Sequence, residues 1–234
     1  YRVSGAKIWT SYAGKADTCF LLARVPASEG GAAGKGGIVI LLTDMASPGI
    51  QVKQIPALVG EGDIHEVFFD EVFVPVENRL GEEGQAWEII NFALANERTG
   101  IARYEFSRRI LDRAVAKLKA EGRWADPVVQ DGAARALMLC EAARMLVYRV
   151  VDAKAQGLPA DAYPSVARWA VVQADNGVND FLTEFLPDGL LGGDPVQQAH
   201  HQRAIAAGVA SGAAEIQLNL ISRRWLELPG EARR

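Results

Sequence analysis

The sequence predicts an α+β protein with two domains, in which a small β-barrel or β-sandwich is followed by an antiparallel four-helix bundle. Two observations support this fold class. Residues 1–83 contain short apolar segments separated by turns rich in Gly, Pro and Ser, which is typical of an all-β domain. In residues 84–234 the apolar side chains recur every three or four positions over long segments, which is typical of helices packed in a bundle.

The expected strands of the first domain are short. A loop rich in Gly, Ala and Ser covers residues 28–37, Ser47-Pro48-Gly49 forms a turn, and Pro75 ends the last strand. Between these signals the apolar residues alternate with polar ones, first from Ile50 and again from His65. We expect strands at residues 1–3, 7–11, 18–24, 38–42, 50–55 and 65–74.

The second domain has the pattern of four long helices. The first is expected over residues 85–121, and the second begins at Asp126-Pro127, where Asp suits the cap and Pro suits the first turn. The third follows Pro164, and Ser211-Gly212 lies in the middle of the fourth. The buried face expected for the fourth helix carries Ile205, Val209, Ile216 and Leu220.

The helices also offer expectations about surfaces. Phe181, Leu182 and Phe185 give the third helix more apolar surface than one small bundle interior needs, so we expect them at a subunit interface. His200 and His201 are neighbours on one helix and face different ways, so we expect surface positions and no shared metal.

Composition and charge exclude other classes of protein. The chain has 234 residues, of which 49% are hydrophobic and 23% are charged, as in ordinary globular proteins. The net charge is −4 and the basic residues form no stripe, so we expect no nucleic-acid partner. No apolar run reaches about 18 residues, so we expect no membrane span.

Two further features concern the setting of the protein. Cys19 and Cys140 are the only cysteines and neither has the neighbours of a metal site, so we expect no metal and a reducing, cytoplasmic setting. The chain starts at Tyr1, inside an expected strand, without an initiator Met or a signal-peptide pattern. We therefore expect it to be the later part of a longer polypeptide.

Glu97 is a carboxylate on an apolar helix stripe. It lies three residues after Leu94 and four before Ile101, and side chains at these spacings share one helix face. Burial disfavours a charged carboxylate, so we expect a raised pKa, which is the property of a general base that works near neutral pH. The alternative is a structural ion pair with a basic group, and the neighbouring Arg98 supports it.

Five segments together resemble the acyl-CoA dehydrogenase family. They are GAKIWTS (5–11), FLLARV (20–25), HEVFFDEVFVPVENRLGEEGQAW (65–87), NERTGIAR (96–103) and EIQLNLISRRWLEL (215–228). The likeness covers the family's middle β domain, residues 1–83, and its C-terminal four-helix domain, residues 84–234. The family's N-terminal helical domain would precede Tyr1.

The resemblance implies an activity and its partners. It implies a bacterial, cytoplasmic flavoprotein of lipid metabolism that uses FAD to dehydrogenate an acyl-CoA thioester between its α and β carbons. A base removes the α-proton and flavin N5 accepts a hydride from the next carbon. The resemblance also implies an electron-transfer flavoprotein as electron acceptor and a tetramer of identical or different subunits.

The resemblance also assigns the cofactor residues. Trp9, Thr10 and Ser11 match the segment that packs an aromatic side chain against the flavin and hydrogen-bonds its N5 edge. Without the resemblance, Trp9 would be a core residue and Ser11 a polar residue at a strand end. Arg123 matches the Arg that reaches the FAD pyrophosphate of a neighbouring subunit, which suits a guanidinium. The alternative is a solvated loop Arg.

The chain departs from the family pattern at the base. Many members carry the catalytic Glu just before a Gly in the final helix region, where this chain has Ser211. A second branch, which includes isovaleryl-CoA and long-chain acyl-CoA dehydrogenases, places the base before an Arg on the earlier helix. Glu97-Arg98 fits that placement, so Glu97 is the predicted base and Arg98 is predicted to bind substrate.

Other departures keep further hypotheses open. The family's Gln-x-x-Gly-Gly flavin motif is not recognised in residues 184–193, Asp126-Pro127 replaces a Phe-Gly, and Ala213 replaces a Thr near the ADP part of the cofactor. These changes favour an alternative in which the chain is a non-catalytic or half-site subunit of a heteromeric acyl-CoA dehydrogenase. A family oxidase, in which oxygen reoxidises the flavin, is a third hypothesis.

Overall fold

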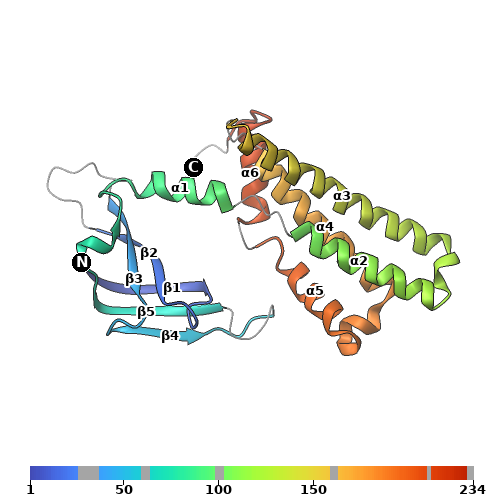
Figure 1. Cartoon of the computed structure of the whole chain (residues 1–234), viewed down its shortest axis with the longest axis horizontal. Coiled ribbons are helices and arrows are strands. Elements are labelled where there is room, and N and C mark those ends of the chain that lie inside the picture. The colour runs from blue at the N-terminus through green and yellow to red at the C-terminus, as the bar shows by residue number, and fades with distance from the viewer. Residues whose placement is uncertain (26–36, 59–63, 98–102, 159–162, 210–211, 231–234) are drawn as a thin grey trace. The chain divides into compact units, whose positions relative to one another are not determined.

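The computed structural model describes residues 1–25, 37–58, 64–97, 103–158, 163–209 and 212–230, with the backbone alone at residues 95–97 (Figure 1). The chain separates into two compact units, Tyr1–Leu94 and Ala95–Arg234. The division between the units falls inside the helix α1 (Ala86–Glu97). The predicted boundary between domains after residue 83 stays a prediction. The α+β fold class, with strands followed by a helical bundle, is confirmed.

The first unit contains two antiparallel sheets of three strands each. One sheet has the strand order β1 (Arg2–Ser11), β5 (Ile64–Phe73) and β4 (Ile50–Gln54). The other has the order β2 (Thr18–Arg24), β3 (Ile38–Asp44) and β6 (Arg79–Leu80). The predicted strand segments are confirmed, except that residues 1–3 and 7–11 belong to the single strand β1, and the two-residue strand β6 was not predicted.

The core of this unit comes from the alternating residues that the strands turn inward. Leu21, Val39 and Leu41 of one sheet pack in one cluster with Val67, Phe69 and Val72 of the other. Because side chains in a strand point alternately to the two faces of the sheet, each strand contributes every second residue to this interior. The arrangement is a small sandwich with the core between its sheets.

α1 begins as part of the β unit. Ala86 and Ile90 pack against Ile40 of β3, and Leu22, Ile38 and Ile89 surround this contact. The sequence predicted one helix over residues 85–121 whose apolar stripe faces a bundle. Within this range the described residues contain α1 and α2 (Arg103–Ala120), and residues 98–102 between them lie outside the described residues.

The second unit is built around α4 (Tyr163–Phe185), which packs against α2, α3 (Pro127–Ala155) and two shorter helices. α3 and α4 run side by side in Figure 1. Their buried faces carry small residues, which lets the helices approach closely. These are Ala133, Ala136 and Ala143 on α3 and Ala167 and Ala174 on α4. Asp126 caps α3 by accepting a hydrogen bond from the Val128 backbone N–H at 2.9 Å, as predicted.

The prediction of a single fourth helix is wrong. Two helices, α5 (Pro195–Ile205) and α6 (Ala214–Arg224), take its place. Between them Gly212 adopts a left-handed φ of 92°, which interrupts a right-handed helix. The predicted apolar face is wrong as well, because Ile205, Val209 and Ile216 are exposed. The buried residues of the two helices are Gln197, His200, Ala204, Ala214 and Gln217.

Two surface expectations are also wrong. Phe181, Leu182 and Phe185 are buried within the unit's own core, where the rings of Phe181 and Phe185 lie 5.0 Å apart. His200 is buried too, against α4. No helix in the described part of the chain has the length and apolar character needed to cross a membrane.

Candidate active site

The end of β1 presents an aromatic ring and a hydroxyl to solvent. A β-bulge interrupts the pairing with β5 between Lys7 and Thr10, and Trp9 adopts a left-handed φ of 63°. Trp9 is 65% exposed and Ser11 is exposed, so the interpretation of Trp9 as a core residue is wrong. A left-handed backbone at a bulky residue costs about 1–3 kcal/mol and tends to occur where function requires it.

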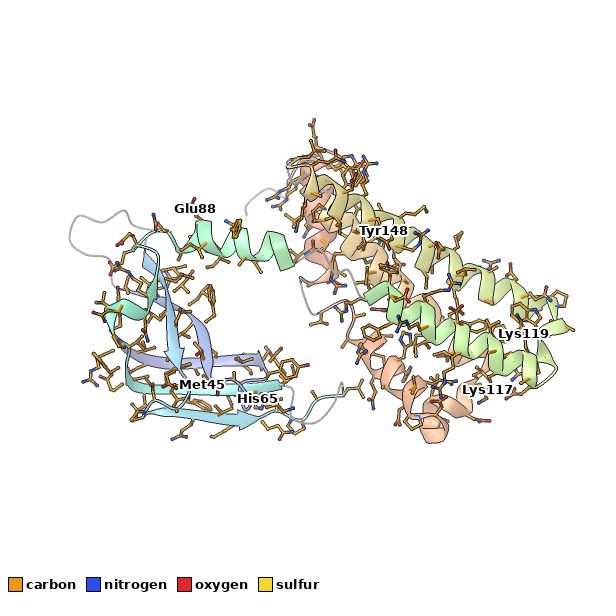
Figure 2. The ribbon with its side chains drawn as sticks, in the orientation of Figure 1. Met45, His65, Glu88, Lys117, Lys119 and Tyr148 are labelled. Carbon is orange, nitrogen blue, oxygen red and sulfur yellow. The ribbon has the colours of Figure 1, made fainter. Side chains whose placement is uncertain are left out.

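The turn after β1 is held by backbone hydrogen bonds and by one buried side chain. The backbone N–H groups of Lys15 and Ala16 donate to the Tyr12 carbonyl at 2.9 and 3.1 Å, and Tyr12 has a second left-handed φ, 58°. Ala13 is buried in the core between the sheets. His65, labelled in Figure 2, is 5% exposed and its backbone pairs with Thr10.

The sequence contained a signal for the burial of His65. It begins the alternation that continues with Val67 and Phe69, all three buried, so its inward orientation follows from period two. The bulge and the left-handed Trp9 had no such signal.

The predicted base lies at the edge of the described structure. Glu97 is the last residue of α1 and only its backbone is described. Arg98 and Ser211 lie outside the described residues. The two interpretations of Glu97, a catalytic base and a structural ion pair, therefore both stay predictions.

Arg123 begins the short helix η3 (Arg123–Ala125), after Gly122 in a left-handed turn with φ 74°. Its Nη1 lies 3.4 Å from Glu121 Oε2, and its side chain is 46% exposed. An exposed ion pair of this kind contributes less than about 1 kcal/mol, so the guanidinium can exchange its partner for a diphosphate. The departure at Asp126-Pro127 has a structural role, because Asp126 is the cap of α3.

The segment η4 (Gly189–Gly193) lies in the part of the chain where the family's Gln-x-x-Gly-Gly motif is expected. Gly192-Gly193 is the one Gly-Gly pair in residues 184–193, and counting back three positions from Gly192 puts Gly189 where the motif has Gln. A Cβ at Gly189 would collide with the side chain of Gln197, which is fully buried and occupies that space.

A buried polar cluster joins three helices of the second unit. Ser107 of α2 donates a hydrogen bond to Asp175 Oδ1 of α4, and His200 of α5 packs beside the same carboxylate. Burial lowers the pKa of His200, although Asp175 opposes this shift, so the imidazole is neutral at pH 7. One turn along α4, Asn179 Oδ1 lies 2.8 Å from His201 Nδ1. The cluster fixes α5 against α4.

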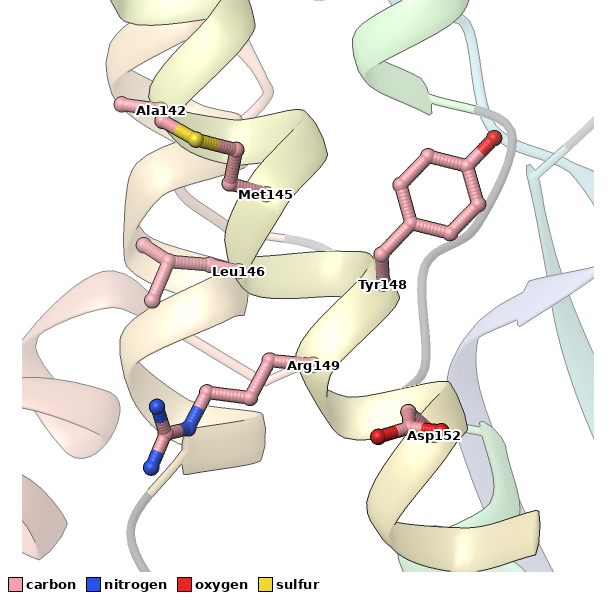
Figure 3. Close-up of a pocket in the computed structure, with 6 residues that line it drawn as sticks. All are labelled: Ala142, Met145, Leu146, Tyr148, Arg149 and Asp152. Atoms are coloured by element: carbon pink, nitrogen blue, oxygen red, sulfur yellow. The ribbon is translucent and has the colours of Figure 1, made fainter.

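Figure 3 shows a pocket on the outer side of α3, lined by Ala142, Met145, Leu146, Tyr148, Arg149 and Asp152. Its charged groups already have partners. Arg149 stacks over the Tyr163 ring at 3.9 Å, and Asp152 accepts a hydrogen bond from Gln156 at 2.8 Å. The remaining lining is apolar and the residues come from one helix, so the pocket is a surface depression rather than a catalytic centre. Among the described residues no three His, Cys, Asp or Glu side chains form a group that could hold a metal ion.

Comparison with known proteins defines the class. Residues 84–226 match the family described as "Acyl-CoA dehydrogenase, C-terminal domain". The chain therefore belongs to the acyl-CoA dehydrogenase family, an oxidoreductase family, and the resemblance expected from the sequence is confirmed.

The individual relatives share about a third of their aligned residues or fewer with this chain. The chain is 30% identical over 229 residues to acyl-CoA dehydrogenase FadE34 of Mycobacterium tuberculosis, covering 97% of this chain and 31% of that protein. It is 28% identical over 238 residues to acyl-CoA dehydrogenase IpdE1 of the same organism, covering 99% of this chain and 60% of that protein. The chain thus spans less than two thirds of the length of these relatives.

Solved structures agree on the fold. A glutaryl-coenzyme A dehydrogenase in complex with glutaryl-CoA superposes with a TM-score of 0.85 at 26% identity, covering 99% of this chain and 60% of that one. The G363A variant of the steroid acyl-CoA dehydrogenase Tcur3481-Tcur3483 gives a TM-score of 0.88 at 23% identity, over 98% of this chain and 62% of that one. At that identity the second comparison shows the shared fold alone.

Proposed function

We propose that the chain forms the middle and C-terminal parts of a flavin-dependent acyl-CoA dehydrogenase that introduces an α,β double bond into an acyl-CoA thioester. The observation that carries this proposal is the end of β1. There the family's flavin segment, Trp9–Ser11, has an exposed indole on the left-handed residue of a β-bulge and an exposed hydroxyl two residues later. Glu97 is the proposed base for the α-proton.

The residues at the end of β1 fit an isoalloxazine ring. Trp9 offers a broad apolar surface for ring packing, and the Ser11 hydroxyl can donate a hydrogen bond at the hydride-accepting edge. Thr10 is half-buried between them and fixes the strand end by pairing with His65. When FAD is bound, it supplies the acceptor for the hydride that leaves the β-carbon.

Other residues are proposed to hold the rest of the cofactor and the substrate. The exposed guanidinium of Arg123 would bind the FAD diphosphate of a neighbouring subunit, and Arg98 would lie beside the acyl-CoA. Removal of the α-proton needs a carboxylate whose pKa is raised by burial, which is the role proposed for Glu97. An electron-transfer flavoprotein is the proposed electron acceptor, in a cytoplasmic pathway of lipid metabolism.

Anaerobic addition of acyl-CoA to the full-length protein tests the proposal. If the function is correct, the protein binds FAD and an acyl-CoA of suitable chain bleaches the visible flavin band. A full-length protein that binds FAD but is not reduced by a series of short, branched, long and steroid acyl-CoA thioesters would contradict it.

One observation favours the second candidate, a non-catalytic or half-site subunit. Gly189 stands where the family motif has Gln, and the buried side chain of Gln197 fills the space that a side chain there would need. This chain therefore has no side chain at position 189 that could make the flavin contact of the motif's Gln. The FAD content per chain, measured with and without a co-expressed related subunit, discriminates the two. About one FAD per chain in the protein alone supports the catalytic proposal, whereas FAD that appears only with the partner supports the second.

A further inference from the structure

The strand end that carries Trp9 and Ser11 lies beside a buried imidazole of the same sheet. His65 of β5 pairs with Thr10 of β1 on one side and with Gln54 of β4 on the other. Directly opposed residues of an antiparallel pair project to the same face, so the imidazole and the Thr10 side chain share a face. Trp9 and Ser11, on either side of Thr10, are exposed. The imidazole therefore lies on the same face of the sheet as the side chain between the two proposed flavin contacts.

The same ring determines why residue 14 is glycine. A Cβ placed on Gly14 would lie 2.8 Å from His65 Nε2 and 3.5 Å from both Cδ2 and Cε1. Contacts under 3.0 Å essentially do not occur, so the ring would have to shift. Gly14 is not among the residues with positive φ, so its backbone conformation is open to any residue. Space for the His65 ring, rather than a special backbone conformation, requires the glycine.

The imidazole of His65 is held by packing rather than by a hydrogen bond at Nδ1. His65 is buried, and its Nδ1 has no hydrogen-bond partner among the described residues. Two contacts fix the turn that follows β1: Ala13 packs in the core, and the His65 ring lies against Gly14. Trp9 and Tyr12 both adopt left-handed backbones, and such conformations persist only where the surrounding structure determines them. His65 contacts this segment at both ends, by pairing at Thr10 and by packing at Gly14.

We propose that His65 is a positioning residue for the flavin. Its buried imidazole, accommodated by the absent side chain of Gly14, holds the end of β1 and the following turn so that Trp9 and Ser11 face the cofactor. The identity of the ligand rests on the proposed function, whereas the coupling of His65 to the strand end does not.

A double-mutant cycle on the full-length protein tests the contact. Gly14→Ala pushes the ring away, and His65→Ala removes it. We expect each single variant to weaken FAD binding by about tenfold, the change that corresponds to ~1.4 kcal/mol. In the double variant the methyl group has the room that the ring vacates, so we expect a loss clearly smaller than the product of the two single losses. Strictly multiplicative losses would overturn the proposed contact.

Val72→Ala is the matched control. Val72 is also fully buried on β5, but it pairs with Val3 at the far end of β1. We expect the control to lower the melting temperature at least as much as His65→Ala and to leave the dissociation constant for FAD unchanged. A His65→Ala variant that loses stability and keeps its FAD affinity would show an ordinary core residue and would overturn the proposal.

Amide hydrogen exchange of the FAD-free protein separates this inference from the proposed function. In Gly14→Ala we expect faster exchange confined to the amides of residues 10–16, whereas Val72→Ala should leave that segment unchanged. A uniform increase across the β unit in both variants would overturn the inference. If the wild-type protein binds no FAD, the proposed function fails, and the exchange pattern still decides whether His65 holds the strand end.

Discussion

At the residue scale, Glu97 is the first position to test. We expect Glu97→Gln to keep the fold and the FAD content but to lower turnover by about 10²–10⁴-fold, the usual contribution of a positioned general base. Glu88→Gln is the matched control, because Glu88 is an exposed carboxylate on the same helix. Steady-state kinetics with an artificial electron acceptor measures both variants. Near-normal turnover in Glu97→Gln would favour the structural ion pair.

Ser211 stands where many family members carry their base, and its replacement tests the alternative placement. A serine needs a neighbouring base to act as a nucleophile, and the described histidines that precede it in α5 face α4. We therefore expect Ser211→Ala to change turnover little under the same assay. A loss as large as that of Glu97→Gln would move the catalytic site to the connection between α5 and α6.

His200 makes the stability of the helical unit depend on pH. Burial lowers the pKa of His200 below its ordinary value of 6.5, so the unfolded chain takes up a proton that the folded chain resists. The contribution of the neutral imidazole is fully present above pH 6.5, and it is lost as the pH falls from 6.5 toward the lower folded-state pKa. Asp175, Arg203 and His201 are the charged or titratable groups that also act on this ring.

Melting temperatures between pH 8 and pH 5 check this expectation. The wild-type protein should lose stability below pH 6.5, and His200→Gln should be less stable at pH 8 but show a smaller further loss on acidification. His201→Gln is the control and should keep the wild-type slope, because His200 remains buried beside Asp175. An unchanged slope in His200→Gln would mean that other groups cause the acid sensitivity.

At the element scale, periodicity predicted that a face is buried but not which neighbour buries it. The apolar stripe of residues 85–121 does contain buried side chains, yet Ile90 belongs to the β unit and Leu111 to the helical core. For α5 and α6 the most apolar residues were assigned to the buried face. The helices instead bury Gln197, His200 and Gln217, whose surroundings come from α2, α4 and η4 and could not be known from one segment.

Local signals at element ends were more informative than the apolar pattern. Asp126 was recognised as a cap because a short polar side chain preceded a proline, and this chemistry does not depend on distant residues. The flavin segment was recognised from its motif, whereas the left-handed Trp9 that exposes the indole depends on a bulge against β5. Burial of His65 could be predicted from alternation, but its contact with Gly14 arises only from the folded turn.

The cap of α3 yields a prediction at this scale. Asp126→Ala removes the acceptor for the Val128 backbone N–H, and we expect it to lower the free energy of unfolding by about 1 kcal/mol. Asp131→Ala is the control, because Asp131 lies on the same helix in an exposed pair with Arg135 and should change stability by less than about 0.5 kcal/mol. Urea denaturation followed by circular dichroism measures both. Equal losses would show that the cap contributes nothing specific.

At the scale of the whole molecule, α3 presents exposed apolar side chains for assembly, whereas the three apolar residues of α4 that were expected at an interface are buried. Phe181, Leu182 and Phe185 complete the core of their own unit. Met138, Met145 and Tyr148 of α3 are exposed, and Met145, 59% exposed, and Tyr148 line the depression of Figure 3. Exposed apolar side chains gathered on one helix are typical of an interface.

We expect the full-length protein to assemble as a dimer of dimers, either of identical chains or with a related partner, and to use this face of α3. Met145→Glu places a charge on the face without disturbing the core, so it should shift the protein to smaller species in light scattering. Ala116→Glu, at an exposed position on α2, is the control with the same change in charge and should leave assembly intact.

Assembly and FAD content should change together. If Arg123 binds the FAD diphosphate of a neighbouring subunit, dissociation by Met145→Glu removes that guanidinium from each site, and FAD should be released in proportion to the loss of the assembled species. Flavin absorbance across the elution profile measures both quantities in one experiment. A stable monomer that keeps FAD and turns over acyl-CoA would contradict the assembly and the role of Arg123. An assembled Met145→Glu variant with full FAD would instead place the interface on another face of the helical unit.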